Sequence, residues 1–68
     1  MNISVNGKAE TVASGSTVRS VLASKELDPA LVSVEHNGKI LDKSELDGTF
    51  LSEGDEVEIL FFMGGGRG

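Results

Sequence analysis

The sequence predicts a small α+β domain in which one main helix packs across a mixed sheet of four or five strands. Short segments that alternate apolar and polar residues occur near both ends and in the middle of the chain, and two of them lead into Asn-Gly pairs. Between them lies one stretch whose apolar residues have helical spacing instead. A single helix among several strands is typical of this fold class.

The first predicted element is a hairpin formed by the segments "ISV" and "KAETV". Asn6-Gly7 between them is the residue pair that a two-residue type I′ turn prefers. Alternation places Ile3, Val5 and Val12 on the inward face of this hairpin. Glu10 falls on the same face, so we expect a β-bulge in the pairing.

The stretch "SGSTVRSVLASKEL" predicts a short amphipathic helix. Its hydroxyl residues suit an N-cap, and Val18, Val21 and Leu22 follow i, i+3, i+4 spacing. Lys25 shares this stripe, where its stem can cover apolar surface while its ammonium group reaches water. Asp28-Pro29 ends the helical region, because the residue before a proline disfavours the helical conformation.

The middle segment "LVSVEHNGKIL" predicts a second hairpin. Val32 and Val34 face inward on its first strand, Asn37-Gly38 forms the turn, and Lys39 to Leu41 form a short returning strand. The polar segment that follows has Leu46 as its apolar anchor, which favours a helical turn over a full helix.

The last predicted strand follows a tight turn at Glu53-Gly54-Asp55. Its inward face consists of three apolar residues, Val57, Ile59 and Phe61. Its other face changes along its length, because Glu58 is polar whereas Leu60 and Phe62 are apolar.

The first and last strands have good inward faces, so we expect them side by side in the centre of the sheet. Two right-handed connections make that pairing parallel, which is the β-grasp arrangement. Residues 1–63 are expected to form this domain, and residues 64–68 are expected to form a flexible, glycine-rich tail.

The charge of the chain argues against nucleic acid as a partner, since the net charge is −5 and phosphate binding needs clustered Lys and Arg. Seven acidic residues and one basic residue lie between Asp42 and Glu58. This segment either steers the protein toward a basic partner or is a solvated face that keeps it in solution. The sequence leaves both interpretations open.

No catalytic or metal-binding residue set is predicted, because the chain has no cysteine and His36 is its only histidine. His36 stands beside an Asn-Gly turn, where a surface role is expected. The absence of cysteine, and of any run near the 20 apolar residues of a membrane span, favours a soluble cytoplasmic protein without membrane contact.

The ending "FFMGGGRG" predicts a threading device. Three extended glycines reach about 10 Å and have no side chains, so they suit a narrow channel in a partner's active site. The apolar residues before them, Leu60, Phe62 and Met63, suit a docking patch. The alternative is that a neighbouring loop covers Leu60 and Phe62 and that the tail has no role.

Together, "VSVEHNGKIL", "LSEGDEVEIL" and "FFMGGG" on a small acidic β-grasp domain resemble the ubiquitin-like sulfur carriers of the ThiS/MoaD family. The "VEHNG" segment and the glycine ending resemble the thiamine-pathway ThiS branch more than the MoaD branch. The resemblance covers Met1 to Gly66 and implies a carrier rather than an enzyme.

In that family an E1-like, ThiF-like adenylyltransferase uses ATP and Mg to adenylate the terminal glycine. A persulfide from a cysteine desulfurase then supplies sulfur, and the resulting thiocarboxylate serves a ThiG-like thiazole synthase. The resemblance implies that the reacting carbonyl belongs to Gly66, with Gly64 and Gly65 as the threading segment. The carrier itself binds no cofactor.

Arg67 and Gly68 depart from the family ending, because they lie beyond the expected terminal glycine. A peptidase could remove them, the chain could load at Gly68, or they could be foreign to the natural chain. Other readings are a molybdopterin-type or other metabolite sulfur carrier, and a ubiquitin-like modifier or interaction module that carries no sulfur.

Overall fold

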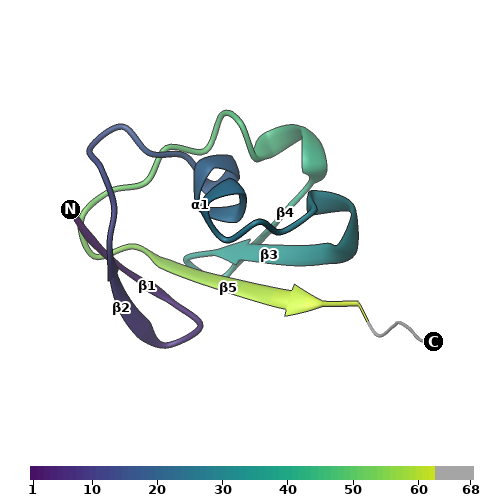
Figure 1. Cartoon of the computed structure of the whole chain (residues 1–68), viewed down its shortest axis with the longest axis horizontal. Helices are drawn as coiled ribbons and strands as arrows, with labels where there is room; N and C mark the ends of the chain where they lie inside the picture. The colour runs from purple at the N-terminus through teal and green to yellow at the C-terminus, as the bar shows by residue number, and fades with distance from the viewer. Residues whose placement is uncertain (63–68) are drawn as a thin grey trace.

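A computed structural model describes residues 1–62 of the chain (Figure 1). Its five strands form one sheet with the order β2-β1-β5-β3-β4, and α1 packs across one face of it. The elements are β1 (Asn2–Val5), β2 (Lys8–Thr11), α1 (Val18–Ser24), the 3-10 turn η1 (Pro29–Leu31), β3 (Val32–His36), β4 (Lys39–Leu41), the 3-10 turn η2 (Lys43–Glu45) and β5 (Glu56–Phe61).

The centre of the sheet is the parallel pair of β1 and β5, with Val5 opposite Val57. Strand β3 lies antiparallel to β5 on its other side, and β2 and β4 form the two edges. This arrangement is the predicted β-grasp fold, so the expected central pairing of the first and last strands is confirmed.

Both predicted Asn-Gly turns are confirmed, because Asn6 and Asn37 have positive φ angles of 49° and 50° and the glycine after each is positive as well. The β-bulge expected near Glu10 is wrong: β1 and β2 pair in continuous register, with Ile3 opposite Glu10. No bulge is needed because the Lys25 ammonium group, 2.5 Å from the Glu10 carboxylate, neutralises it on the helix-facing side.

Helix α1 begins as predicted with a hydroxyl N-cap. The Thr17 side chain accepts from the backbone N–H of Ser20, and the Ser20 hydroxyl accepts from the N–H of Thr17. The helix ends at Ser24, before the predicted boundary at Asp28, and no helix in the described part of the chain is long and apolar enough to cross a membrane.

The early end of α1 has a local cause. Glu26 adopts a left-handed φ of 59°, and the N–H of Leu27 donates to the carbonyl of Leu22. Together with the bond from Glu26 N–H to Ala23, this is the Schellman pattern that closes a helix. Pro29 then starts η1 instead of ending α1.

The core lies between α1 and the sheet. Its buried apolar residues are Ile3, Val5, Val18, Val21, Leu22, Val32, Val34, Leu41, Leu46, Leu51, Val57 and Ile59. Every residue predicted to face inward belongs to this set except two. Val12 is half-buried and packs against the core, whereas Phe61 is 60% exposed.

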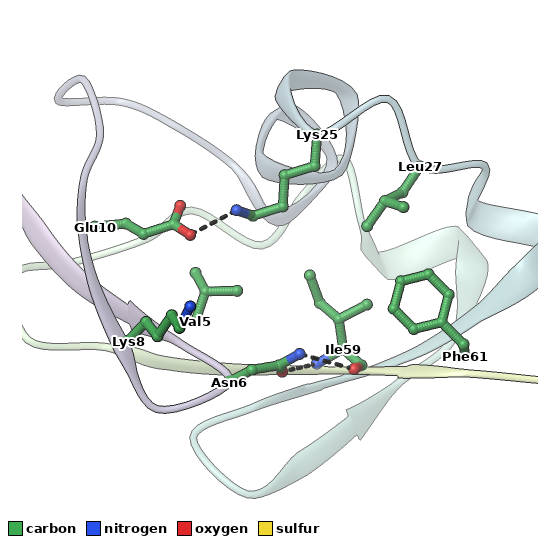
Figure 2. A pocket seen from close by; sticks show the side chains of 8 residues that line it. All are labelled: Val5, Asn6, Lys8, Glu10, Lys25, Leu27, Ile59 and Phe61. Carbon is green, nitrogen blue, oxygen red and sulfur yellow. Dashed lines mark hydrogen bonds and ion pairs between the residues drawn. The ribbon is translucent and has the colours of Figure 1, made fainter.

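The prediction that Phe61 belongs to the core is therefore wrong. Its side chain does point to the helix-facing side of the sheet, toward Leu27 (Figure 2). However, β1 ends at Val5, opposite Val57, so no strand of the described chain lies beside Phe61 on that side, and Phe61 lines an open groove.

Candidate functional site

Burial falls abruptly along β5. Val57 and Ile59 are 1% and 4% exposed, whereas Leu60, Phe61 and Phe62 are 51%, 60% and 57% exposed. We call these last three residues the tail root, because they lead directly into Met63 and the glycines. Three consecutive large apolar side chains, each more than half exposed, are typical of an interaction surface.

The residues of the tail root are distributed around the end of the strand. Leu60 lies on the sheet face away from α1, opposite Ser33 of β3. Phe61 lies on the helix-facing side. The Phe62 ring has the Lys43 ammonium nitrogen 5.5 Å from its centroid, a cation–π contact that fixes its position near η2.

A fourth exposed apolar residue adjoins the tail root. Leu31 of η1 is 60% exposed, and its carbonyl oxygen accepts a hydrogen bond of 3.1 Å from the N–H of Phe62. The sequence pattern singled out neither Leu31 nor Phe61 as a surface residue. Nothing in the pattern marks them, since their exposure depends on which distant segments lie beside them in the fold.

Strand β5 is held in place at this end by the side chain of Asn6. Its Oδ1 accepts from the N–H of Ile59 at 2.6 Å, and its Nδ2 donates to the Ile59 carbonyl at 3.2 Å. The side-chain amide thereby replaces a backbone peptide group and extends the pairing between β1 and β5 beyond Val57 (Figure 2).

A groove of about 270 Å³ lies beside the tail root on the helix-facing side of the sheet. Figure 2 shows its apolar side chains pointing into the space between α1 and β5, with the ion pair of Lys25 and Glu10 at one end. The lining residues are Val5, Asn6, Lys8, Glu10, Lys25, Leu27, Ile59 and Phe61.

His36 lies away from the tail root, in a network that joins two turns. Its Nε2 lies 2.8 Å from Oδ2 of Asp55, whose Oδ1 also accepts from Asn37. The hydrogen bond with His36 lowers the pKa of Asp55 below its ordinary value. Both side chains are largely buried, so the surface role expected for His36 is wrong, and its contact with Asp55 makes it a structural anchor between the two turns.

The site residues predicted from sequence divide into two groups. Leu60 and Phe62 are exposed at the end of β5, so no neighbouring loop among the described residues covers them. The predictions for Met63, Gly64, Gly65, Gly66 and the Arg67-Gly68 pair lie outside the described residues. Within residues 1–62, no three His, Asp or Glu side chains gather as a metal site would require.

Comparison with known proteins agrees with this geometry. The sequence model of the ThiS family matches residues 3–66, from the first strand through the third glycine of the ending. The chain belongs to the ThiS family. The match to this ThiS-family model agrees with the resemblance stated from the sequence.

A solved structure and curated relatives extend the family likeness. The crystal structure of thiamine biosynthesis protein ThiS from Geobacter metallireducens is 42% identical and has a TM-score of 0.83, with 97% of this chain and all of that chain covered. The sulfur carrier protein ThiS of Bacillus subtilis is 38% identical over 50 residues, which are 74% of this chain and 76% of that protein.

A longer protein also contains a region similar to this chain. A thiazole synthase from Magnetococcus marinus is 30% identical over 67 residues, which are 98% of this ThiS-family chain. The chain spans only about a fifth, 21%, of that synthase, so the likeness concerns one part of it.

Proposed function

We propose that this chain carries sulfur for the synthesis of the thiamine thiazole, as a thiocarboxylate on the carbonyl of Gly66. The observation that carries the proposal is the ThiS family match, which continues beyond the last strand and ends at Gly66. The exposed tail root supports it, because an activating enzyme needs a surface on which to dock the carrier.

The proposed chemistry has three steps. The Gly66 carboxylate attacks the α-phosphate of ATP, held with Mg by a ThiF-like adenylyltransferase, and pyrophosphate leaves. The terminal sulfur of a persulfide, supplied by a cysteine desulfurase, then attacks the carbonyl carbon and displaces AMP. A thiol finally cleaves the sulfur–sulfur bond and leaves the thiocarboxylate. Adenylation is needed because a free carboxylate has no good leaving group.

We propose that the carrier docks through Leu60, Phe62 and Met63 while Gly64 and Gly65 thread into the partner. The sulfur acceptor is a ThiG-like thiazole synthase, a proposal supported by the synthase of Magnetococcus marinus that contains a region similar to this chain. We propose that the chain acts with these partners in the cytoplasm.

Arg67 and Gly68 require a further step, since the family match stops at Gly66. We propose that a peptidase removes them before loading. The intact mass of the protein recovered from its native host tests this step. A form that retains Arg67 and Gly68 and still accepts sulfur would contradict it and favour loading at Gly68.

The central test is a loading assay. The chain ending at Gly66 is incubated with the adenylyltransferase of its host, ATP, Mg and a persulfide donor, and its intact mass is measured. Replacement of one terminal oxygen by sulfur, followed by transfer to thiazole synthase, is expected. Isopeptide-linked adducts would favour a ubiquitin-like modifier, and transfer to a molybdopterin precursor would favour a MoaD-type carrier.

A further inference from the structure

The groove beside the tail root has an apolar floor that is only partly covered. Val5 and Ile59 are buried core residues at its base, and half-buried Leu27 stands across from Phe61 (Figure 2). Phe61 leaves 60% of its surface exposed at the end nearest the tail. A large apolar side chain from another molecule would complete the layer between Leu27 and Phe61.

The charge of the groove differs from that of the rest of the molecule. Two lysines and one glutamate line it, whereas the whole chain carries a net charge of −5. Lys25 and Glu10 neutralise each other at 2.5 Å, and Lys8 makes no ion pair within residues 1–62. The groove is therefore a positively charged, apolar site that favours a carboxylate next to an apolar group.

The backbone of β5 adds a third feature at Phe61. The N–H of Phe62 donates to Leu31 on the β3 side, so alternation directs the N–H and C=O of Phe61 toward the β1 side. On that side, the pairing of β1 with β5 ends at Val57, and the side-chain amide of Asn6 hydrogen-bonds only to the backbone groups of Ile59. Within the described chain, Phe61 thus presents a strand edge that can pair with an extended peptide.

We propose that the groove binds an extended peptide segment of the activating partner, one with a bulky apolar residue next to an acidic residue. The apolar side chain fills the space between Leu27 and Phe61, the peptide backbone pairs with Phe61, and the carboxylate contacts Lys8. That the peptide belongs to the activating partner rests on the proposed function, whereas the binding of such a peptide in the groove does not.

A titration with a defined probe tests the recognition directly. The probe is a capped tetrapeptide of glycine, phenylalanine, aspartate and glycine, added to the ¹⁵N-labelled chain at up to about 10 mM, so that binding with a dissociation constant as high as about 1 mM is detected. Saturable shifts of the amides of Lys8, Leu27 and Phe61 are expected. The absence of shifts there, or larger shifts elsewhere, would overturn the proposal.

Matched variants separate the groove from general surface effects. Lys8→Glu is expected to raise the dissociation constant of the probe at least fivefold. Lys39→Glu makes the same charge change on the far edge strand and is expected to leave that dissociation constant unchanged. Phe61→Ser is expected to abolish binding, whereas Phe50→Ser removes an equally exposed phenylalanine near the N-terminus of α1 and does not. Equal effects within either pair contradict the proposal.

The same variants distinguish this inference from the proposed function. If the wild-type chain binds the probe but is not adenylated, the groove stands and the sulfur-carrier proposal fails. If the wild-type chain is adenylated and Phe61→Ser raises the KM for the carrier no more than Phe50→Ser does, the groove inference fails and the carrier function stands. Thermal unfolding of each variant verifies that it is folded.

Discussion

Asn6 performs two functions with one side chain. Its backbone has the positive φ that the type I′ turn needs, and its amide pairs with both backbone polar groups of Ile59. The turn requirement alone could be met by glycine, which adopts positive φ freely. The pairing with Ile59 is what makes the asparagine amide specifically useful here, because it continues β1 beyond its last residue.

Replacing Asn6 tests this second role. Asn6→Gly keeps the turn conformation but leaves the N–H and C=O of Ile59 without their partners, so the free energy of unfolding is expected to fall by about 1–3 kcal/mol. Asn6→Asp keeps only the acceptor, so its free energy of unfolding should lie between those of wild type and of Asn6→Gly. Urea unfolding measures both, and a Gly variant as stable as wild type would show that the amide is dispensable.

Asp55 makes stability depend on pH. Its pKa is lowered in the folded protein, chiefly by the hydrogen bond with His36, so it stabilises the fold fully above its unfolded pKa of about 3.9. That stabilisation is lost as the pH falls through the lower folded pKa. We expect Asp55→Asn to be less stable than wild type at pH 7, with the difference shrinking at pH 3.

Urea unfolding of both proteins at pH 7 and pH 3 measures this effect. The other carboxylates titrate in both proteins, so the difference between them isolates Asp55. A stability difference that is the same at the two pH values would mean that the Asp55 charge does not contribute.

Among the elements, α1 is notable for the residue that ends it. A left-handed φ costs a residue with a Cβ about 1–2 kcal/mol, and Glu26 occupies such a position where glycine is preferred. The turn at Glu26 leads the chain to Leu27, which lines the groove across from Phe61.

Glu26→Gly is expected to raise the free energy of unfolding by about 0.5–1 kcal/mol, because relief of the left-handed strain exceeds the entropy that glycine loses on folding. Ala23→Gly, inside the helix, provides the opposite control and should cost about 1 kcal/mol. Thermal unfolding measures both. If Glu26→Gly destabilises as much as Ala23→Gly, the strain at this position is negligible.

Strand β5 has a structural half and an exposed half. Leu60→Glu is expected to raise the KM of the carrier for its adenylyltransferase at least tenfold while the melting temperature stays close to that of wild type, since Leu60 is outside the core. Phe50→Glu, at a similarly exposed residue paired with Thr17, is the control. Equal KM values for the two variants would assign Leu60 no docking role.

At the scale of the whole molecule, the folded body and the tail are expected to behave independently. Gly65→Leu should abolish loading, because a side chain widens the segment that enters the partner, yet change the free energy of unfolding by less than about 0.5 kcal/mol. ATP–pyrophosphate exchange and urea unfolding measure the two effects. Normal loading of this variant would exclude a narrow channel.

Much of the fold could be predicted from the sequence because local signals agree with one another. The two Asn-Gly turns, the hydroxyl N-cap of α1 and the inward valines each follow from short-range rules, and together they leave one sensible sheet order. For Leu60 and Phe62 the pattern left two possibilities open, a docking patch or cover by a loop, and their exposure excludes the loop within the described residues.

The remainder depends on contacts between distant segments. Lys25 neutralises Glu10 across the core face, so the register needs no bulge, but the sequence does not say that these two residues meet. Phe61 has the right alternation for the core and is still exposed, because β1 ends opposite Val57 and Phe61 lines an open groove. Such results depend on element lengths, which sequence patterns define least well.

The central position of β5 has a consequence for how the protein is made. The sheet joins residue 5 to residue 57, so a nascent chain that has not yet emerged as far as β5 holds only two separate hairpins, β1–β2 and β3–β4. Isolated hairpins are marginally stable in water. The complete sheet can therefore form only after the ribosome has released β5, and a chain cut short before β5 presents neither the tail root nor the groove to an activating enzyme.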